Sequence, residues 1–187
     1  MYDYVTDKEF LKSMRGTCSG LVNQLVQRIN NDSVMKVQAH LIGSGAKNLV
    51  TQNANLPVDL DYNLCIIKTT TENCRDIKEY VRKQFNTVLN ANGWGDCQDS
   101  TSALTTEKRH FRRGNQTEFS IDLAITRCDS NGWQRLIHQK TGFASMDLYM
   151  WNQVQNSRHL EEKVQFLKSN GLWLALRETY LTKKTCT

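Results

Sequence analysis

The sequence contains a single proline in 187 residues, and its ten glycines are spread along the chain. It therefore has no stretch typical of a low-complexity linker. No window approaches the roughly 18 uninterrupted apolar residues of a membrane span. The residues from Met1 to Tyr4 lack the basic and then apolar start of a secretory signal peptide. These absences predict a cytoplasmic protein with no membrane partner.

Cysteine is present but follows no metal-binding or disulfide pattern. The six cysteines are scattered, none belongs to a CxxC motif, and no group of cysteine and histidine has the spacing of a zinc site. A disulfide framework is not expected in a chain this long without a secretion signal. We therefore expect reduced cysteines that fill space.

Length and charge suit one globular domain with a small appendage. Hydrophobic residues make up 39% of the chain and charged residues 23%, a balance that allows a buried core. The net charge of +5 is mild. It suits a polyanionic ligand but does not by itself indicate a nucleic-acid partner.

The spacing of apolar residues predicts a mixture of helices and strands. Helical spacing over residues 6–29 predicts one or two helices, and the same spacing over 69–92 predicts another. Period-2 alternation predicts strands over 58–67 and 118–125, and further strands are expected at 34–42, 102–113 and 133–139. From about Asp147 onward the apolar residues return to helical spacing, which predicts a helical tail.

Three aspartates lie on the polar faces of the two alternating strands. Asp59 and Asp61 share one face with side chains about 7 Å apart, because that is twice the rise of a strand. Asp122 lies opposite the apolar residues of the later strand. If the strands are neighbours, three carboxylates surround one cavity, where two magnesium ions would stabilise the entering and leaving oxygens of an in-line displacement. The alternative is three ordinary exposed carboxylates on the wet face of a sheet.

The segment Gly43-Ser44-Gly45 precedes this acidic pair and predicts a phosphate-binding turn. Glycines let the backbone approach a phosphate closely, and successive N–H groups bind anions. Ser44 adds a hydroxyl, and Lys47 lies within reach of terminal phosphates as a point charge. A tight turn and a solvated lysine are the alternatives.

The order of these motifs resembles the DNA polymerase β-like nucleotidyltransferase superfamily, in particular its compact bacterial members. The similarity runs from residue 41 to 123. It comprises the apolar-Gly-Ser turn, a spacer, Asp59-Leu60-Asp61 within a strand, and a distal strand carrying Asp122. Many compact members carry arginine near the position of Lys47, and Pro57 is not a required feature, so the subfamily stays open.

The resemblance implies an α+β fold, a nucleotidyltransferase-like mixed β-sheet packed with helices. We expect a catalytic core over residues 1–140 and a helical C-terminal subdomain over 141–187 packed on it. Gly43, Ser44 and Lys47 would contact the triphosphate of an NTP, and Asp59 and Asp61 would ligate two Mg²⁺ ions. Asp122 would ligate the catalytic ion and help deprotonate the acceptor hydroxyl. The reaction would move an NMP to a small molecule, a protein or an RNA end and release pyrophosphate.

Other interpretations stay open at this point. The alternative function is a nucleotide-binding protein of the same fold with little turnover, of a toxin–antitoxin or defence type. The basic run from Lys108 to Arg113 is either a solvated strand edge or a contact for the triphosphate or an acidic acceptor. Trp133, Trp151 and Trp173 are expected to anchor the tail to the sheet, or one of them to stack on a base.

Overall fold

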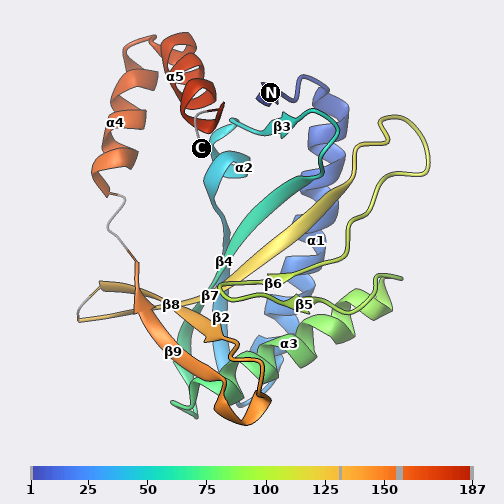
Figure 1. Ribbon diagram of the computed structural model, residues 1–187, viewed down its shortest axis with the longest axis vertical. Helices are drawn as coiled ribbons and strands as arrows, with labels where there is room; N and C mark the ends of the chain where they lie inside the picture. Colours follow the sequence, from blue (N-terminus) through green and yellow to red (C-terminus); the bar gives the residue numbers. More distant parts are fainter. Residues whose placement is uncertain (1, 131, 155–157, 186–187) are drawn as a thin grey trace.

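The computed structural model describes residues 2–130, 132–154 and 158–185, and it centres on a mixed sheet (Figure 1). The strands of the sheet are β2 (Met35–Leu41), β4 (Val58–Thr69), β5 (Gln98–Asp99), β6 (Leu104–Thr105), β7 (Phe119–Asp129), β8 (Gly132–Gln139) and β9 (Leu148–Gln153). Their order is β2-β4-β7-β6-β5, with β8 pairing with both β7 and β9. The central β4–β7 pair is parallel and the other pairs are antiparallel.

Helices and a small second sheet surround these strands. The helices are α1 (Lys8–Asn31), α2 (Gly43–Lys47), α3 (Cys74–Ala91), α4 (Arg158–Ser169) and α5 (Trp173–Thr185), with a 3₁₀ turn at Ala144–Met146. Strands β1 (Tyr2–Tyr4) and β3 (Thr51–Asn53) form the two-stranded sheet. The long helices α1 and α3 pack against one face of the main sheet, while α4 and α5 lie beyond its upper end (Figure 1).

The core lies between α1, α3 and the apolar faces of β4 and β7. Leu60 and Leu64 of β4 and Ile121 and Leu123 of β7 are fully buried there. They alternate with the polar positions of the same strands, so the opposite face of the sheet is left for polar side chains. The expected strand alternation is therefore what divides the sheet into a core face and a functional face.

Local signals explain where the first helix begins and why it continues. Asp7 is the N-cap of α1, and its side chain accepts a hydrogen bond from Phe10 N at 2.9 Å. Gly16 and Gly20 lie within one unbroken helix, because its buried stripe packs against the sheet on both sides of them. Tertiary packing thus offsets the low helix propensity of glycine.

The expectation of a helix starting near Asp147 is wrong. Residues 148–153 form β9, in which Leu136 of β8 pairs with Trp151. Tyr149 and Trp151 pack against the core while Leu148 and Met150 are exposed, a period of two rather than 3.6. Short apolar runs fit both periods, and pairing with β8 decides between them. Helix returns in the described residues only at Arg158, and the domain boundary near residue 140 stays a prediction.

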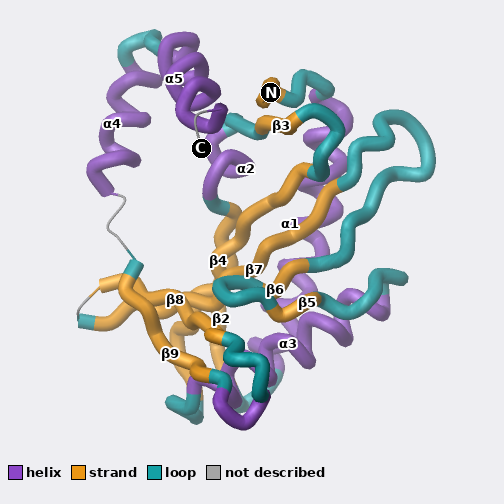
Figure 2. Tube along the Cα trace, viewed as in Figure 1, coloured by secondary structure: helices purple, strands orange, loops and turns teal. Residues whose placement is uncertain are grey.

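The expected strand over residues 102–113 is modified by the structure. The segment 102–113 forms only the two residues of β6 and an isolated bridge between Arg109 and Phe119. The rest of it is part of a long loop (Figure 2).

Among the described cysteines, Cys18, Cys65 and Cys97 are buried and unpaired, and burial raises the pKa of the Cys18 thiol to about 12. No helix in the described ranges is long and apolar enough to cross a membrane.

Candidate active site

The three predicted aspartates are brought together by the parallel pairing of β4 and β7. In this register Asp59 lies opposite Ser120 and Asp61 lies opposite Asp122. Neighbouring strands lie about 4.8 Å apart, and alternate side chains share a face. All three carboxylates therefore occupy adjacent positions on the face of the sheet away from α1 and α3.

The Gly-Ser-Gly segment lies directly against this group as the start of α2. Ile42 N donates to the carbonyl of Asp61 at 2.8 Å, which holds the end of β2 beside β4. Gly43 has φ +61°, and a Cβ placed there would lie 2.9 Å from Asp61 Oδ2. Gly45 is buried, and its Cβ position would lie 2.8 Å from a methyl carbon of Leu60. Both glycines are thus needed for the close approach of α2 to the acidic strand.

The electrostatics of the group reflect burial and mutual repulsion. Burial raises the pKa of Asp61, and the negative charges of Asp122 and Asp59 raise it further. Burial also raises the pKa of Asp122, against a lowering by its hydrogen bond with Thr105, and Asp59 adds to the rise. Partly buried carboxylates that repel one another are stabilised by a bound cation.

Hydroxyl groups on neighbouring positions orient two of these carboxylates. Thr105 Oγ1 of β6 donates to Asp122 Oδ1 at 2.5 Å. Ser120 Oγ donates to Asp59 Oδ1 across the β4–β7 pair. Each aspartate accepts a hydroxyl hydrogen bond on one oxygen, which limits the rotation of its side chain.

Comparison with known proteins identifies the fold. The sequence matches no protein-family model and no curated protein. Among solved structures it is similar to the Vibrio cholerae cyclic AMP-GMP synthase DncV, in complex with nonhydrolyzable GTP. The TM-score is 0.60 and the identity 10%, and the match covers 96% of this chain and 61% of DncV. The chain has the polymerase β-like nucleotidyltransferase fold.

Two other solved structures are similar at lower TM-scores. E. coli MS115-1 CdnC with ATP matches with a TM-score of 0.49 and 15% identity, over 87% of this chain and 46% of CdnC. The Cid1 poly(U) polymerase with MgGTP matches with a TM-score of 0.42 and 21% identity, over 65% of this chain and 33% of Cid1. The fold assignment rests on DncV. The chain spans less than two thirds of the length of each of these proteins. The expected α+β fold and superfamily resemblance are confirmed at the level of fold.

The donor set of this nucleotidyltransferase fold suits a hard divalent cation. Mg²⁺ prefers carboxylate oxygens and keeps waters and phosphates in its shell. In the described part of the chain, no three His, Cys, Asp or Glu side chains are already gathered closely enough to hold an ion. Asp122 and Asp59 each bond instead to a hydroxyl group on a neighbouring strand, Thr105 of β6 and Ser120 of β7. The residues fit the cation chemically, because three carboxylates at adjacent positions of one sheet face offer it oxygen ligands.

Two cations near the carboxylates were missed in the sequence. Arg135 of β8 and Lys184 near the end of α5 both lower the pKa of Asp61. Arg135 Nε is buried without a hydrogen-bond partner among the described residues. Period-2 spacing in β8 places Arg135 on one defined face, but no local signal marks Lys184. Both are suited to face the phosphates of a ligand at the carboxylates.

The other predicted residues take less central positions. Ser44 follows Gly43 in the first turn of α2, while Lys47 lies in its last turn, so its contact with phosphates stays a prediction. Within the basic run, Arg109 pairs with Glu107 at 2.7 Å and covers Trp94 at 5.5 Å, a structural role. Arg112 and Arg113 are exposed in the long loop. The expectation of a core anchor at Trp133 is wrong, because this side chain is 48% exposed.

Proposed function

We propose that this protein is a magnesium-dependent nucleotidyltransferase that moves an NMP from an NTP to an acceptor hydroxyl and releases pyrophosphate. The observation that carries this is the contact between the start of α2 and Asp61, with Asp122 opposite Asp61 on the parallel strand. A glycine-lined backbone beside paired carboxylates is suited to a triphosphate and its cations. The DncV structure contains a nonhydrolyzable GTP, which supports an NTP as the substrate.

The roles proposed for the residues follow from their positions. Gly43 and Ser44 bind the triphosphate, and Asp59 and Asp61 hold two Mg²⁺ ions. Asp122 holds the catalytic ion and accepts the proton of the acceptor hydroxyl, for which a carboxylate with a raised pKa is better suited than an ordinary aspartate. When bound, the ions polarise the phosphate and neutralise charge on the leaving pyrophosphate. Arg135 and Lys184 add positive charge to the same region.

The acceptor is a small molecule, a protein or an RNA end. A cytoplasmic location stays a prediction.

A second candidate function is nucleotide binding with little turnover, in a toxin–antitoxin or defence setting. It is favoured by the hydroxyl-bonded carboxylates, which are not gathered around an ion site in the described residues. In that case NTP binding would persist without pyrophosphate release.

The test is pyrophosphate release from each NTP with and without Mg²⁺, over a panel of acceptors that includes RNA and the protein itself. We expect Mg²⁺-dependent release that Asp59→Ala abolishes with the fold intact. Asp96→Ala is the matched control, because Asp96 is an exposed aspartate on the loop that follows α3. NTP binding without release across the whole panel would favour the second function.

A further inference from the structure

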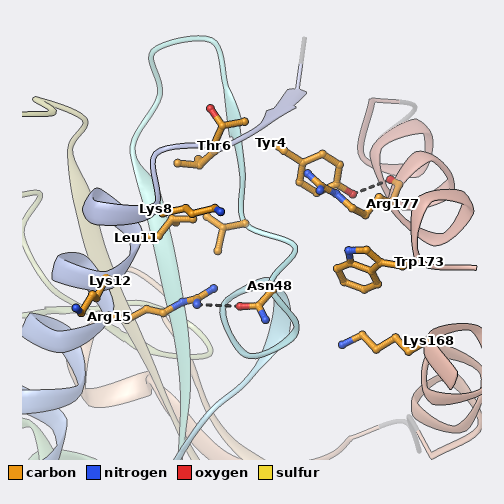
Figure 3. Close-up of a pocket in the computed structure, with 12 residues that line it drawn as sticks. Tyr4, Thr6, Lys8, Leu11, Lys12, Arg15, Asn48, Lys168, Trp173 and Arg177 are labelled. Atoms are coloured by element: carbon orange, nitrogen blue, oxygen red, sulfur yellow. Dashed lines mark hydrogen bonds between the residues drawn. The ribbon is translucent and has the colours of Figure 1, made fainter. Parts of the chain in front are cut away.

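A cavity of about 870 Å³ lies between α1, the end of α2, and the helices α4 and α5 (Figure 3). We propose that it is a second ligand site, for a nucleoside phosphate that is either a free nucleotide or one residue of an RNA chain. Its volume falls within the range of about 300–1,000 Å³ that is typical of small-molecule sites. None of the residues assigned above to metal or triphosphate lines it.

The lining of the cavity is strongly basic. Five cationic side chains line it, and no acidic one does among the side chains that the structure describes; the cations are Lys8, Lys12, Arg15, Lys168 and Arg177. Of the two acids beside Lys8 in sequence, Asp7 is engaged in capping α1 and also accepts from Asn115, and the exposed Glu9 does not line the cavity. Five cations from three helices around one cavity, with no described acid among its lining residues, have the character of a site for phosphate.

The three cations of α1 lie where they destabilise the helix. Lys8, Lys12 and Arg15 follow one another at spacings of four and three, so they share one face of its first two turns. Positive side chains repel each other at that spacing and oppose the helix dipole near its N-terminus. A bound anion would offset both the repulsion and the unfavourable interaction with the helix dipole. Anion binding therefore accounts for these three cations, whereas helix stability does not.

Arg15 is the cation of α1 whose position at the cavity is fixed by a hydrogen bond. Its Nη1 donates to Asn48 Oδ1 at 2.9 Å, which fixes the guanidinium across the floor of the cavity. Its Nε is buried and has no hydrogen-bond partner among the described residues. The hydrogen bond to Asn48 thus holds the guanidinium at the cavity, where its fork of N–H donors suits a phosphate.

The side of the cavity formed by α4 and α5 carries aromatic side chains next to cationic ones. Trp173 lies at the start of α5 beside Lys168, whose Nζ is 4.7 Å from its ring, and it is half-buried at the cavity (Figure 3). Arg177 lies over the ring of Tyr4 at 4.0 Å, and the Tyr4 hydroxyl donates to the Arg177 carbonyl at 2.6 Å. Rings next to cations are the combination that binds a base and its phosphate together. Trp173 is thus the tryptophan best placed to stack on a base.

The cavity and the carboxylates lie at opposite ends of α2. Gly43 at its start faces Asp61, whereas Asn48, its C-cap, lines the cavity. A five-residue helix is about 7.5 Å long. Helix α5 reaches both places, since Trp173 lines the cavity and Lys184 acts on Asp61. A nucleoside phosphate can therefore occupy the cavity while the carboxylate site is filled, and it would fix α5 against the core.

The experiment measures metal-free binding of AMP, a short single-stranded RNA and inorganic phosphate to the full chain in EDTA, where binding at the carboxylates is suppressed. Fluorescence of wild type is compared with Trp173→Phe. We expect AMP or RNA to quench Trp173. Lys8→Glu/Lys12→Glu is expected to weaken binding by about tenfold or more, because it reverses two phosphate contacts. Lys83→Glu, an exposed lysine on α3, is the control and should change affinity by less than about twofold.

The outcomes separate the two sources and can overturn the site. Tight binding of AMP indicates a free nucleotide, and binding of RNA alone indicates a polynucleotide. The site is refuted if neither binds, if Lys83→Glu weakens binding as much as the double variant, or if inorganic phosphate binds as tightly as AMP. Circular dichroism shows whether each variant is folded. Pyrophosphate release is not measured here, so failure of this site is distinct from failure of the transferase function.

Discussion

A Cβ at Gly43 would lie 2.9 Å from Oδ2 of Asp61. Real Cβ atoms essentially never lie that close to another atom, so any side chain at Gly43 would displace the carboxylate of Asp61 or the start of α2. The same residue has φ +61°, a conformation that disfavours every residue with a side chain. The backbone proposed to bind phosphate and the carboxylate proposed to bind metal are therefore coupled through one residue.

Gly43→Ala should disrupt this coupling. We expect pyrophosphate release to fall by about 100-fold, since a displacement near 1 Å in an active site has that effect. Gly93→Ala is the matched control, because Gly93 also has positive φ, at +74°, but has no atom within 4 Å of its Cβ position. Both variants should lose about 1 kcal/mol of unfolding free energy from backbone strain. Equal activity losses in the two variants would contradict the contact with Asp61.

The burial and repulsion at Asp61 should be visible in stability. Because its pKa is raised in the folded state, at pH values between the two pKa values the folded protein binds more protons than the unfolded chain. The resulting stabilisation is complete below the ordinary aspartate pKa of about 3.9 and is lost as pH rises through the raised value. Asp61→Asn should therefore raise Tm in EDTA at pH 7, and should raise it by less at acidic pH. Each kcal/mol gained in the free energy of unfolding corresponds to about 2–4 °C in Tm.

Bound Mg²⁺ should stabilise the folded protein at neutral pH, as protonation of Asp61 does in acid. Adding Mg²⁺ at pH 7 should raise the Tm of the wild type but have little effect on Asp61→Asn, because the cation relieves repulsion that the variant lacks. Differential scanning fluorimetry with Ca²⁺-free buffers measures both. An equal response of the two proteins to Mg²⁺ would remove Asp61 from the metal site.

Thr105 is predicted to control the proton acceptor. Its hydrogen bond stabilises the charged form of Asp122, so Thr105→Val should raise the pKa of Asp122 further. The acidic limb of the pH profile of turnover should move to higher pH, with little change in NTP affinity. Thr87→Val on α3, which replaces an exposed threonine, should leave the profile unchanged. A loss of activity that does not depend on pH would indicate a structural role alone.

Lys184 is predicted to assist binding of the triphosphate from α5. Lys184→Met keeps the length of the side chain and removes the charge, so KM for the NTP should rise by about threefold to tenfold with a smaller effect on kcat. Lys183→Met, which changes the exposed neighbour, should have a weaker effect. Equal effects of the two variants in steady-state kinetics would show that only net charge matters.

The sequence contained the alternation of Asp59, Asp61 and Asp122 because period-2 burial is a local property of a strand. It did not contain the register that sets Asp61 opposite Asp122, which depends on pairing between segments 61 residues apart. Lys184 was missed for the same reason, since α5 reaches the carboxylates only through tertiary packing. The strand β9 was mistaken for helix because its short apolar run fits both periods until β8 pairs with it.

Asp122 separates chemistry from binding in the proposed mechanism. Asp122→Asn should lower turnover far more than NTP affinity, because its role lies with the acceptor hydroxyl. Binding measured by calorimetry with a non-hydrolysable NTP, beside steady-state turnover, provides the comparison. Equal losses in binding and turnover would instead make Asp122 a ligand for the donor alone.

Nucleotidyl transfer is tested most directly by following separately labelled phosphates. The protein is incubated with Mg²⁺ and each NTP carrying label at either the α- or the γ-phosphate, together with the acceptor panel. We predict that α-label becomes attached to an acceptor, that γ-label leaves as pyrophosphate, and that Asp61→Ala loses both. Release of γ-label as inorganic phosphate, or an unchanged rate in Asp61→Ala, would contradict the proposed reaction.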